Sequence, residues 1–193
     1  MGAFERSEKG MEFNMNLFIN ASNREKNCFK ILKNIMKKDD CLISLSGKNI
    51  EFCKGCNKCS TNLENYCVIS DYMKEIYSKM VEADKIIIAS PIYMNFINGL
   101  LKNLIDRLNP YFAHSELLKN KEIYLILIGQ LTEEENKETV DMITKYFDSL
   151  TEFMEFNFHF LGYISSGIIE EIDDIEKNNA NYKEIIEKIR KSI

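Results

Sequence analysis

Four of the six cysteines lie within fifteen positions, and their spacing is the strongest chemical signal in the chain. Two residues separate Cys53 from Cys56 and Cys56 from Cys59, and Cys67 follows after seven more. Three thiolates with this spacing can present sulfur to adjacent corners of one compact iron–sulfur cube, and a fourth can complete it from the far side of a short loop. The spacing therefore favours a 4Fe-4S cluster bound by these four cysteines.

Other roles remain open for the same four cysteines. A tetrahedral zinc site usually takes two separated Cys-x2-Cys pairs, whereas here the second pair overlaps the first, so zinc is the second interpretation. Disulfides are the third, because no apolar signal segment opens the chain and cytosolic thiols are normally kept reduced. The simplest interpretation is four ordinary thiols in a loop.

A polar loop at residues 20–28 is a candidate anion site. It follows a short apolar run and leads into a segment with helical periodicity, and the N-terminal amides of a helix favour an anion such as phosphate. Ser22 and Asn27 can donate hydrogen bonds, and Arg24 can pair with a phosphate oxygen. The alternative is a loop in which Ser22 or Asn23 only caps the helix.

An apolar loop at residues 89–96 is a candidate site for a flat aromatic ligand. It reads Ala-Ser-Pro-Ile-Tyr-Met-Asn-Phe, which is more apolar than a surface loop otherwise needs. Tyr93 could lie against a ring, backbone amides near Met94 and Asn95 could bond its polar edge, and Phe96 could close one side. The alternative is a hydrophobic helix entry that packs on a neighbouring subunit.

The elements that position these loops alternate between strand and helix. Apolar runs predict strands at 14–20, 41–45, 85–90, 122–129 and 156–163. Helical periodicity predicts helices at 24–37, 96–108, 132–153 and 174–191, and one more helix that begins after a cap at Asp71. Pro91 is expected to end the third strand.

This alternation indicates an α/β fold, a flavodoxin-like three-layer sandwich whose five-stranded parallel sheet has the order 2-1-3-4-5. In such sheets ligands bind beyond the carboxyl ends of the strands, where the strand order reverses. The loops at 20–28 and 89–96 would both lie at that edge.

Length and composition fit one ordinary soluble domain. The chain has 193 residues, 45% hydrophobic and 28% charged. We expect a flexible leader at 1–12 and a single flavodoxin-like domain at 13–193 with a cysteine-rich loop at 53–67. A net charge of −5 without a basic face argues against nucleic acid, and no apolar run approaches the roughly 20 residues of a membrane span. We expect a cytoplasmic protein without a membrane partner.

Together these motifs resemble the NADPH-dependent FMN reductase family, and in particular its iron–sulfur flavoprotein branch. The resemblance covers about residues 14–108, and its further marks within that range are Ala83-Asp84 before the third strand and the segment 101–107. It implies that FMN is bound by Ser22, Asn23, Arg24, Asn27, Cys28, Pro91, Ile92, Tyr93, Met94, Asn95 and Phe96. It also implies a 4Fe-4S cluster on Cys53, Cys56, Cys59 and Cys67, with NAD(P)H as a possible electron donor.

The chain departs from the usual pattern of this family in three places. Ala21 and Asn23 replace the glycine and proline of the phosphate loop, and Cys28 stands where a hydroxyl is expected. Gly129-Gln130 replaces the glycine-rich turn that often follows the fourth strand. We therefore expect weaker FMN binding than is usual for the family.

The leading hypothesis is an FMN-dependent oxidoreductase that passes electrons between a reduced donor and a small acceptor or redox partner through the cluster, as a homodimer or larger. No catalytic side chain is named, because the cofactors carry the chemistry. A cluster-free NAD(P)H-dependent FMN or quinone reductase is the second hypothesis. A metal- or redox-sensing binding protein on the same scaffold is the third.

Overall fold

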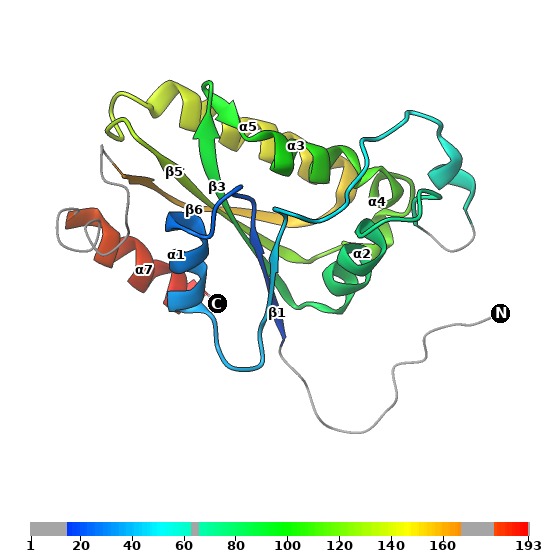
Figure 1. The fold of residues 1–193 in the computed structure, drawn as a ribbon, viewed down its shortest axis with the longest axis horizontal. Helices are drawn as coiled ribbons and strands as arrows, with labels where there is room; N and C mark the ends of the chain where they lie inside the picture. Colours follow the sequence, from blue (N-terminus) through cyan, green and yellow to red (C-terminus); the bar gives the residue numbers. More distant parts are fainter. Residues whose placement is uncertain (1–14, 63–65, 167–179, 193) are drawn as a thin grey trace.

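A computed structural model describes residues 15–62, 66–166 and 180–192 of the chain (Figure 1). The expected leader at 1–12 and the first turns of the helix expected at 174–191 lie outside the described residues. None of the helices in the described segments is long and apolar enough to cross a membrane.

The centre of the molecule is a sheet of five parallel strands. They are β1 (Asn16–Asn20), β2 (Cys41–Ser44), β3 (Lys85–Tyr93), β5 (Glu122–Gly129) and β6 (Asn157–Ser165), arranged in the order β2-β1-β3-β5-β6. A two-residue strand, β4 (Phe96–Ile97), pairs antiparallel with the end of β3. Counted among the parallel strands alone, the order is 2-1-3-4-5, which confirms the predicted topology.

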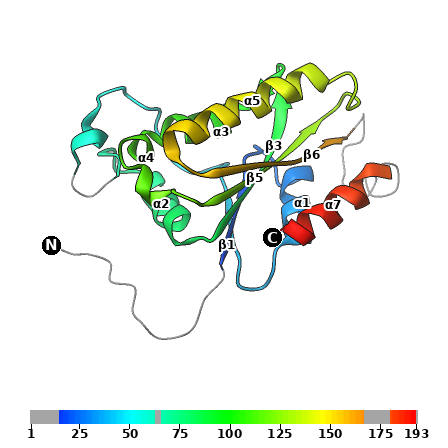
Figure 2. The same ribbon diagram turned by 180° about the vertical axis from the view of Figure 1, so that it is seen from behind.

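Helices cover both faces of this sheet (Figures 1 and 2). One face carries α1 (Asn27–Ile35) and α7 (Ala180–Ser192), and the other carries α2 (Met73–Glu82), α3 (Gly99–Asp106) and α5 (Lys137–Met154). Alternate residues of β1 enter the two layers, because Leu17 and Ile19 belong to one core cluster and Phe18 to the other. Burial on both faces explains the unbroken apolar runs of the central strands.

Three shorter elements complete the described fold. The cysteine loop contains a 3-10 turn, η1 (Lys58–Thr61), which packs on α4 (Asn109–Ala113), the helix that follows α3. A second 3-10 turn, η2 (Ser115–Leu117), leads toward β5. The cysteine loop therefore rests on the segment that follows α3.

Pro91 does not end the third strand, contrary to the prediction. β3 continues to Tyr93, and Pro91 is paired with Ile128 of β5. The pairing of β3 with β1 stops at Ala89, so beyond this residue one side of β3 lacks its β1 neighbour. The missing N–H of proline is tolerated at such an edge position.

The helix expected from residue 96 begins only at Gly99. Phe96 and Ile97 instead form β4, joined to β3 by the two-residue turn of Met94 and Asn95, whose φ angles are 49° and 57°. Positive φ at both central residues is the feature of a type I′ hairpin turn, which matches the twist of the flanking strands. The side chain of Asn98 then caps α3 by accepting a hydrogen bond from the N–H of Leu101 at 2.9 Å.

The other element boundaries differ less from the predictions. α1 spans nine residues inside the predicted range 24–37, and β6 extends to Ser165. α5 begins at Lys137 because the preceding residues form a separate turn, in which Glu135 accepts hydrogen bonds from the N–H and hydroxyl of Thr132. The topology thus follows the prediction, while loops replace several of the expected helix starts.

Candidate functional site

An open pocket of about 470 Å³ lies at the carboxyl ends of β1, β3, β5 and β6. We call it the strand-end pocket. Its lining consists of Ser22, Arg24, Lys26, Asn27, Cys28, Pro91, Ile92, Tyr93, Met94, Asn95, Ile128, Gln130, Leu131, Asn136 and Ser166. This volume is within the range of small-molecule and cofactor sites, and the position between β1 and β3 is the point where the strand order reverses.

The loop after β1 is fixed by its neighbours on both sides. The buried amide of Asn20 accepts a hydrogen bond from the N–H of Ser22 at 3.2 Å and donates one to the hydroxyl of Ser44 at 3.1 Å. The N–H of Ala21 donates to the carbonyl of Ala89 at 2.9 Å, and Asn98 donates to the carbonyl of Ala21. The start of this loop is therefore rigid before any ligand binds.

The expectation that Ser22 or Asn23 caps the following helix is wrong. α1 begins at Asn27 with Lys26 as its N-cap, and no side chain of the described residues caps it. The hydroxyl of Ser22 instead accepts the N–H of Arg24 at 3.2 Å, which turns the loop before the helix starts. An uncapped helix start is open to an anion.

One half of the strand-end pocket is polar and positively charged. Arg24 and Lys26 supply the charges, next to the positive end of the α1 dipole. The side-chain oxygen of Asn27 is buried without a hydrogen-bond partner among the described residues, which marks a polar group available to a ligand. Burial raises the pKa of Cys28 to about 12, although its backbone N–H and Arg24 act against this shift. The thiol of Cys28 therefore stays neutral and adds no negative charge.

The other half of this pocket holds its apolar side chains, most of them from the β3–β4 hairpin, together with polar groups after β5 and β6. Tyr93 is 41% exposed, and Met94, at the hairpin tip, is 98% exposed. Ile128 and Leu131 line the pocket at the end of β5. A flat ring system could lie between these walls with its charged end toward α1.

Gly129 allows the end of β5 to close against β6. A Cβ atom at this position would lie 2.5 Å from the Tyr163 hydroxyl oxygen and 2.8 Å from Asn136 Nδ2. That hydroxyl accepts a hydrogen bond from Asn136 at 2.7 Å and donates to the carbonyl of Leu131 at 2.6 Å. Ser166 donates from its N–H to the carbonyl of Gly129 at 2.7 Å. This network shapes the far wall of the pocket.

The structure brings nine of the eleven expected FMN residues into the strand-end pocket, but Asn23 and Phe96 lie outside its lining. The carbonyl of Asn23 accepts a hydrogen bond from Ser46, and the ring of Phe96 packs on Tyr146 with ring centroids 5.6 Å apart. Lining residues that the sequence analysis did not assign are Lys26, Ile128, Gln130, Leu131, Asn136 and Ser166. Most of them lie at or after the carboxyl ends of β5 and β6, at the same edge of the sheet as those of β1 and β3. The predicted topology could therefore have identified them.

A second pocket brings the four clustered cysteines together. Cys53, Cys56, Cys59 and Cys67 all line a small space of about 20 Å³, which we call the cysteine pocket. Its other lining residues are Lys54, Asn57, Ile69, Asp106, Arg107 and Asn109. Cys53 and Cys56 are exposed, whereas Cys59 is buried and its sulfur accepts a hydrogen bond from Asn109 at 3.1 Å. The two pockets share no lining residue.

The cysteines are free thiols, and their expected ligation stays a prediction. Among residues 15–62, 66–166 and 180–192, no three Cys, His, Asp or Glu side chains lie close enough to hold a metal ion. Residues 63–65, which belong to the same loop, lie outside this description. The chemistry of the donor set, four sulfurs around one pocket, nevertheless suits an iron–sulfur cluster.

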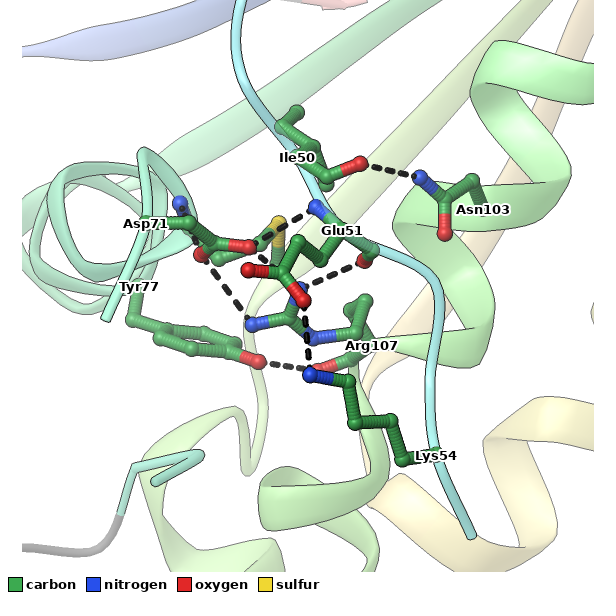
Figure 3. Close-up of polar contacts among 8 residues, drawn as sticks. Ile50, Glu51, Lys54, Asp71, Tyr77, Asn103 and Arg107 are labelled. Atoms are coloured by element: carbon green, nitrogen blue, oxygen red, sulfur yellow. Dashed lines mark hydrogen bonds and ion pairs between the residues drawn. The ribbon is translucent and has the colours of Figure 1, made fainter. Parts of the chain in front are cut away.

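A buried ion pair lies beside the cysteine pocket (Figure 3). Arg107 Nη1 lies 2.6 Å from Asp71 Oδ2 and Arg107 Nη2 lies 3.1 Å from Asp71 Oδ1, with both side chains 0% exposed. Arg107 also donates to the carbonyl of Glu51 at 2.6 Å, and its own carbonyl accepts the hydroxyl of Tyr77. This network joins the start of the cysteine loop to α2 and to the end of α3.

The charges of this pair stabilise each other. Burial alone would raise the pKa of Asp71, but hydrogen bonds from Arg107 and from the N–H groups of Glu51 and Met73 lower it below the ordinary value. Burial alone would lower the pKa of Arg107, but Asp71 raises it. Asp71 does bond the N–H of Met73 in the first turn of α2, yet Tyr72 is the N-cap, so the expected capping role is secondary to this ion pair. This pair was not predicted from the sequence.

The chain is similar to known flavoproteins in sequence and in fold. Residues 16–148 match the model of the NADPH-dependent FMN reductase family. An iron–sulfur flavoprotein of Methanocaldococcus jannaschii is 36% identical over 105 residues, which are 54% of this chain and 53% of the relative. An iron–sulfur flavoprotein of Methanosarcina thermophila is 35% identical over 101 residues, 52% of each protein. The matches thus span about half the length of these curated relatives.

Solved structures show the same fold at lower sequence identity. An azoreductase from Bacillus anthracis superposes with a TM-score of 0.63 at 19% identity, covering 93% of this chain and 100% of that one. An NADPH-quinone reductase from P. pentosaceus gives a TM-score of 0.60 at 12% identity, covering 92% and 95%. At these identities the likeness concerns the fold alone.

Proposed function

Because the chain belongs to the NADPH-dependent FMN reductase family, we propose that it is an FMN-dependent oxidoreductase that passes electrons between a reduced donor and a small acceptor or redox partner. NAD(P)H is the donor class that the family suggests. The observation that carries this proposal is the division of the strand-end pocket into a positive half at α1 and an apolar half at the β3–β4 hairpin. A ligand with a phosphate at one end and a flat ring at the other suits that division.

The residues of the strand-end pocket hold and orient FMN in this proposal. Arg24, Ser22 and the start of α1 bind the phosphate, and the buried amide of Asn27 contacts the polar chain. Tyr93 lies against the ring, and the positive φ at Met94 and Asn95 turns the hairpin tip toward it. Bound FMN supplies two-electron acceptance and single-electron release, so the side chains need no acid or base role.

We propose further that Cys53, Cys56, Cys59 and Cys67 hold a 4Fe-4S cluster. Two observations support this proposal: the four cysteines line one pocket, and the side-chain amide of Asn109 donates a hydrogen bond to the sulfur of Cys59. A third is the buried Nε of Arg107, which has no hydrogen-bond partner among the described residues. Such a cluster supplies one-electron transfer. The names of the relatives as iron–sulfur flavoproteins point the same way.

The wider organisation of the protein is part of the same proposal. We propose one FMN-binding domain over residues 13–193, working in the cytoplasm as a homodimer or larger assembly. Since the two pockets share no lining residue in one chain, electron transfer between them could also use the flavin of a partner subunit. Light scattering of the purified protein measures the assembly size, and a monomer would contradict this part.

A cluster-free NAD(P)H-dependent FMN or quinone reductase is the second candidate. It is favoured by the exposure of Cys53 and Cys56 and by the absence of three close ligating side chains among the described residues. In that case the cysteines are free, redox-labile or structural.

The first experiment is an ultraviolet–visible spectrum of protein purified without oxygen, together with flavin, iron and acid-labile sulfide content. Flavin with about four irons and four sulfides per chain is the expected result. Flavin without iron, even after anaerobic reconstitution, would support the second candidate. Protein without flavin before and after FMN reconstitution would overturn the proposal, and zinc binding by such protein would support a metal-sensing role.

A further inference from the structure

We propose that Arg107 donates its Nε–H to a sulfur atom of the cluster in the cysteine pocket and is the buried positive charge that raises the reduction potential of that cluster. This inference rests on the proposed function, because it requires the four cysteines to hold a cluster. It assigns a role to a residue outside the cysteine motif.

The position of Arg107 is fixed by the fold. Its N–H bonds the carbonyl of Asn103 at 3.1 Å at the end of α3, and its carbonyl accepts the hydroxyl of Tyr77. Its side chain is fully buried, and Arg107 is among the residues that line the same small pocket as the four cysteines. The guanidinium is therefore held next to the place where the cluster would bind.

The hydrogen bonds of the guanidinium leave one buried donor unused. Nη1 donates to Asp71 and to the carbonyl of Glu51, and Nη2 donates to Asp71 (Figure 3). Nε is buried and has no partner among the described residues. Because the guanidinium is planar and forms hydrogen bonds to Asp71 through two of its nitrogens, it cannot rotate to bring Nε to another acceptor. A buried N–H without a partner is rare in native proteins and points to a missing acceptor.

Sulfur is the acceptor that the surroundings offer. The side chains that line the cysteine pocket include four cysteines, and Cys59 already accepts one hydrogen bond from Asn109. Asp106, which also lines it, is paired with Lys102 at 2.5 Å. Hydrogen bonds to the sulfurs and nearby charge are established determinants of cluster potential.

The charge of Arg107 acts in the same direction as its hydrogen bond. A reduced cluster carries one more negative charge than the oxidised form, so a buried cation favours reduction. Asp71 offsets part of the charge of Arg107, but of these two residues only Arg107 lines the cysteine pocket, so the positive end of the pair lies nearer the cluster. Lys54 also lines the pocket, but its side chain is 62% exposed, and solvent screens its charge. Lys54 is thus a matched control with the same sign of charge.

The first test is a redox titration of the cluster in intact protein, with the wild type, Arg107→Lys, the double variant Asp71→Asn/Arg107→Met, and Lys54→Met. The double variant removes both buried charges, so it leaves no unpaired ion in the interior. We expect the double variant to lower the reduction potential of the cluster by at least about 59 mV, which is a tenfold change in the equilibrium for one electron. Arg107→Lys, which keeps the charge without the Nε–H, should shift less, and Lys54→Met should shift least. Equal shifts in the Arg107 and Lys54 variants would overturn the proposal.

The second test uses the wild-type protein and does not depend on how a variant folds. Protein is prepared with ¹⁵N in its arginine side chains, reduced, and examined by pulsed electron paramagnetic resonance. We expect a ¹⁵N coupling to the cluster that is absent from equally labelled Arg107→Lys. Of the other arginines in the described residues, Arg24 lines the other pocket and Arg190 bonds Asn34 on α1. Absence of this coupling in the wild type would overturn the hydrogen bond.

Iron analysis of the wild type separates this inference from the proposed function. Protein that binds flavin but no iron would overturn the cluster and, with it, the role of Arg107. Protein with a full cluster, no ¹⁵N coupling and an unchanged potential in the double variant would overturn the role of Arg107 alone.

Discussion

The strand-end pocket and the cysteine pocket are built in opposite ways. The first lies at the carboxyl ends of four parallel strands, and hydrogen bonds among its loops hold its 470 Å³ open. The second is formed by a loop with two exposed thiols and encloses only about 20 Å³, although a buried ion pair fixes its side. A sheet edge preforms a ligand site. A loop of the kind proposed to hold a cluster is instead completed by the group that it binds, because metal binding is coupled to local folding.

The sharpest way to break this comparison is to remove one proposed cluster ligand from the loop. Cys56→Ser should lose the cluster iron and sulfide while flavin content stays the same, because the two pockets share no lining residue. Iron, sulfide and flavin analysis of anaerobically purified protein measures this. The control is Cys41→Ser, a half-buried cysteine of β2 outside the motif, which should keep its iron. Full iron in Cys56→Ser would disprove the ligand assignment.

Removing Asp71 tests whether the ion pair is the rigid part of the loop site. Asp71→Asn leaves the charge of Arg107 buried without its partner, which should lower the free energy of unfolding by about 3–5 kcal/mol. Urea unfolding at neutral pH measures the change. The control is Glu82→Gln, which breaks the exposed pair with Lys79 and should cost about 0–1 kcal/mol. Equal losses in the two variants would show that the buried pair has no special role.

The same pair predicts a pH dependence. The pKa of Asp71 is lowered in the folded protein, so its stabilisation is complete above the unfolded value of about 3.9 and is lost as pH falls through the lower folded value. The difference in unfolding free energy between wild type and Asp71→Asn should therefore shrink between about pH 5 and the acid limit. A difference that stayed constant over this range would contradict the lowered pKa.

The charged half of the strand-end pocket can be tested with a smaller change. Arg24→Gln should weaken FMN binding about tenfold, or about 1.4 kcal/mol, because it removes one charge-assisted hydrogen bond to the phosphate from an exposed position. Fluorescence titration of apoprotein with FMN measures the affinity. Lys33→Gln, on α1 but outside the pocket, is the control. Equal affinities in Arg24→Gln and wild type would reject the phosphate assignment.

The smallest expected effect concerns the hairpin tip. Met94 has a φ of 49°, which a side chain with a Cβ adopts at a cost, so Met94→Gly should raise the free energy of unfolding by about 0.5–1 kcal/mol. The same change should weaken FMN binding, because the exposed side chain lines the apolar half of the pocket. Urea unfolding and FMN titration measure both effects. A loss of stability in Met94→Gly would contradict the strain at this residue. Asn95→Gly is the control, because asparagine already tolerates a positive φ.

Local patterns predicted the fold because each strand and helix carries its own periodicity. The apolar runs of β1, β3 and β5 indicated buried parallel strands, and the topology followed from the alternation with helices. The error at Phe96 arose because Ile97 continues the helical stripe of α3, so hairpin and helix start give the same apolar pattern there. The error at Pro91 arose because the edge on which proline is tolerated exists only in the assembled sheet.

The sequence by itself determined the strand order, the cysteine spacing and nine lining residues of the strand-end pocket, since these depend on local periodicity and on the rule that strand ends share an edge. The tertiary structure alone decided that Asp71 pairs with Arg107, 36 positions away, and that Gly129 must be small beneath Tyr163. It also decided that Arg107 Nε is buried without a partner among the described residues. Pairing and burial depend on which distant segments pack together, and no local pattern in a single sequence encodes that.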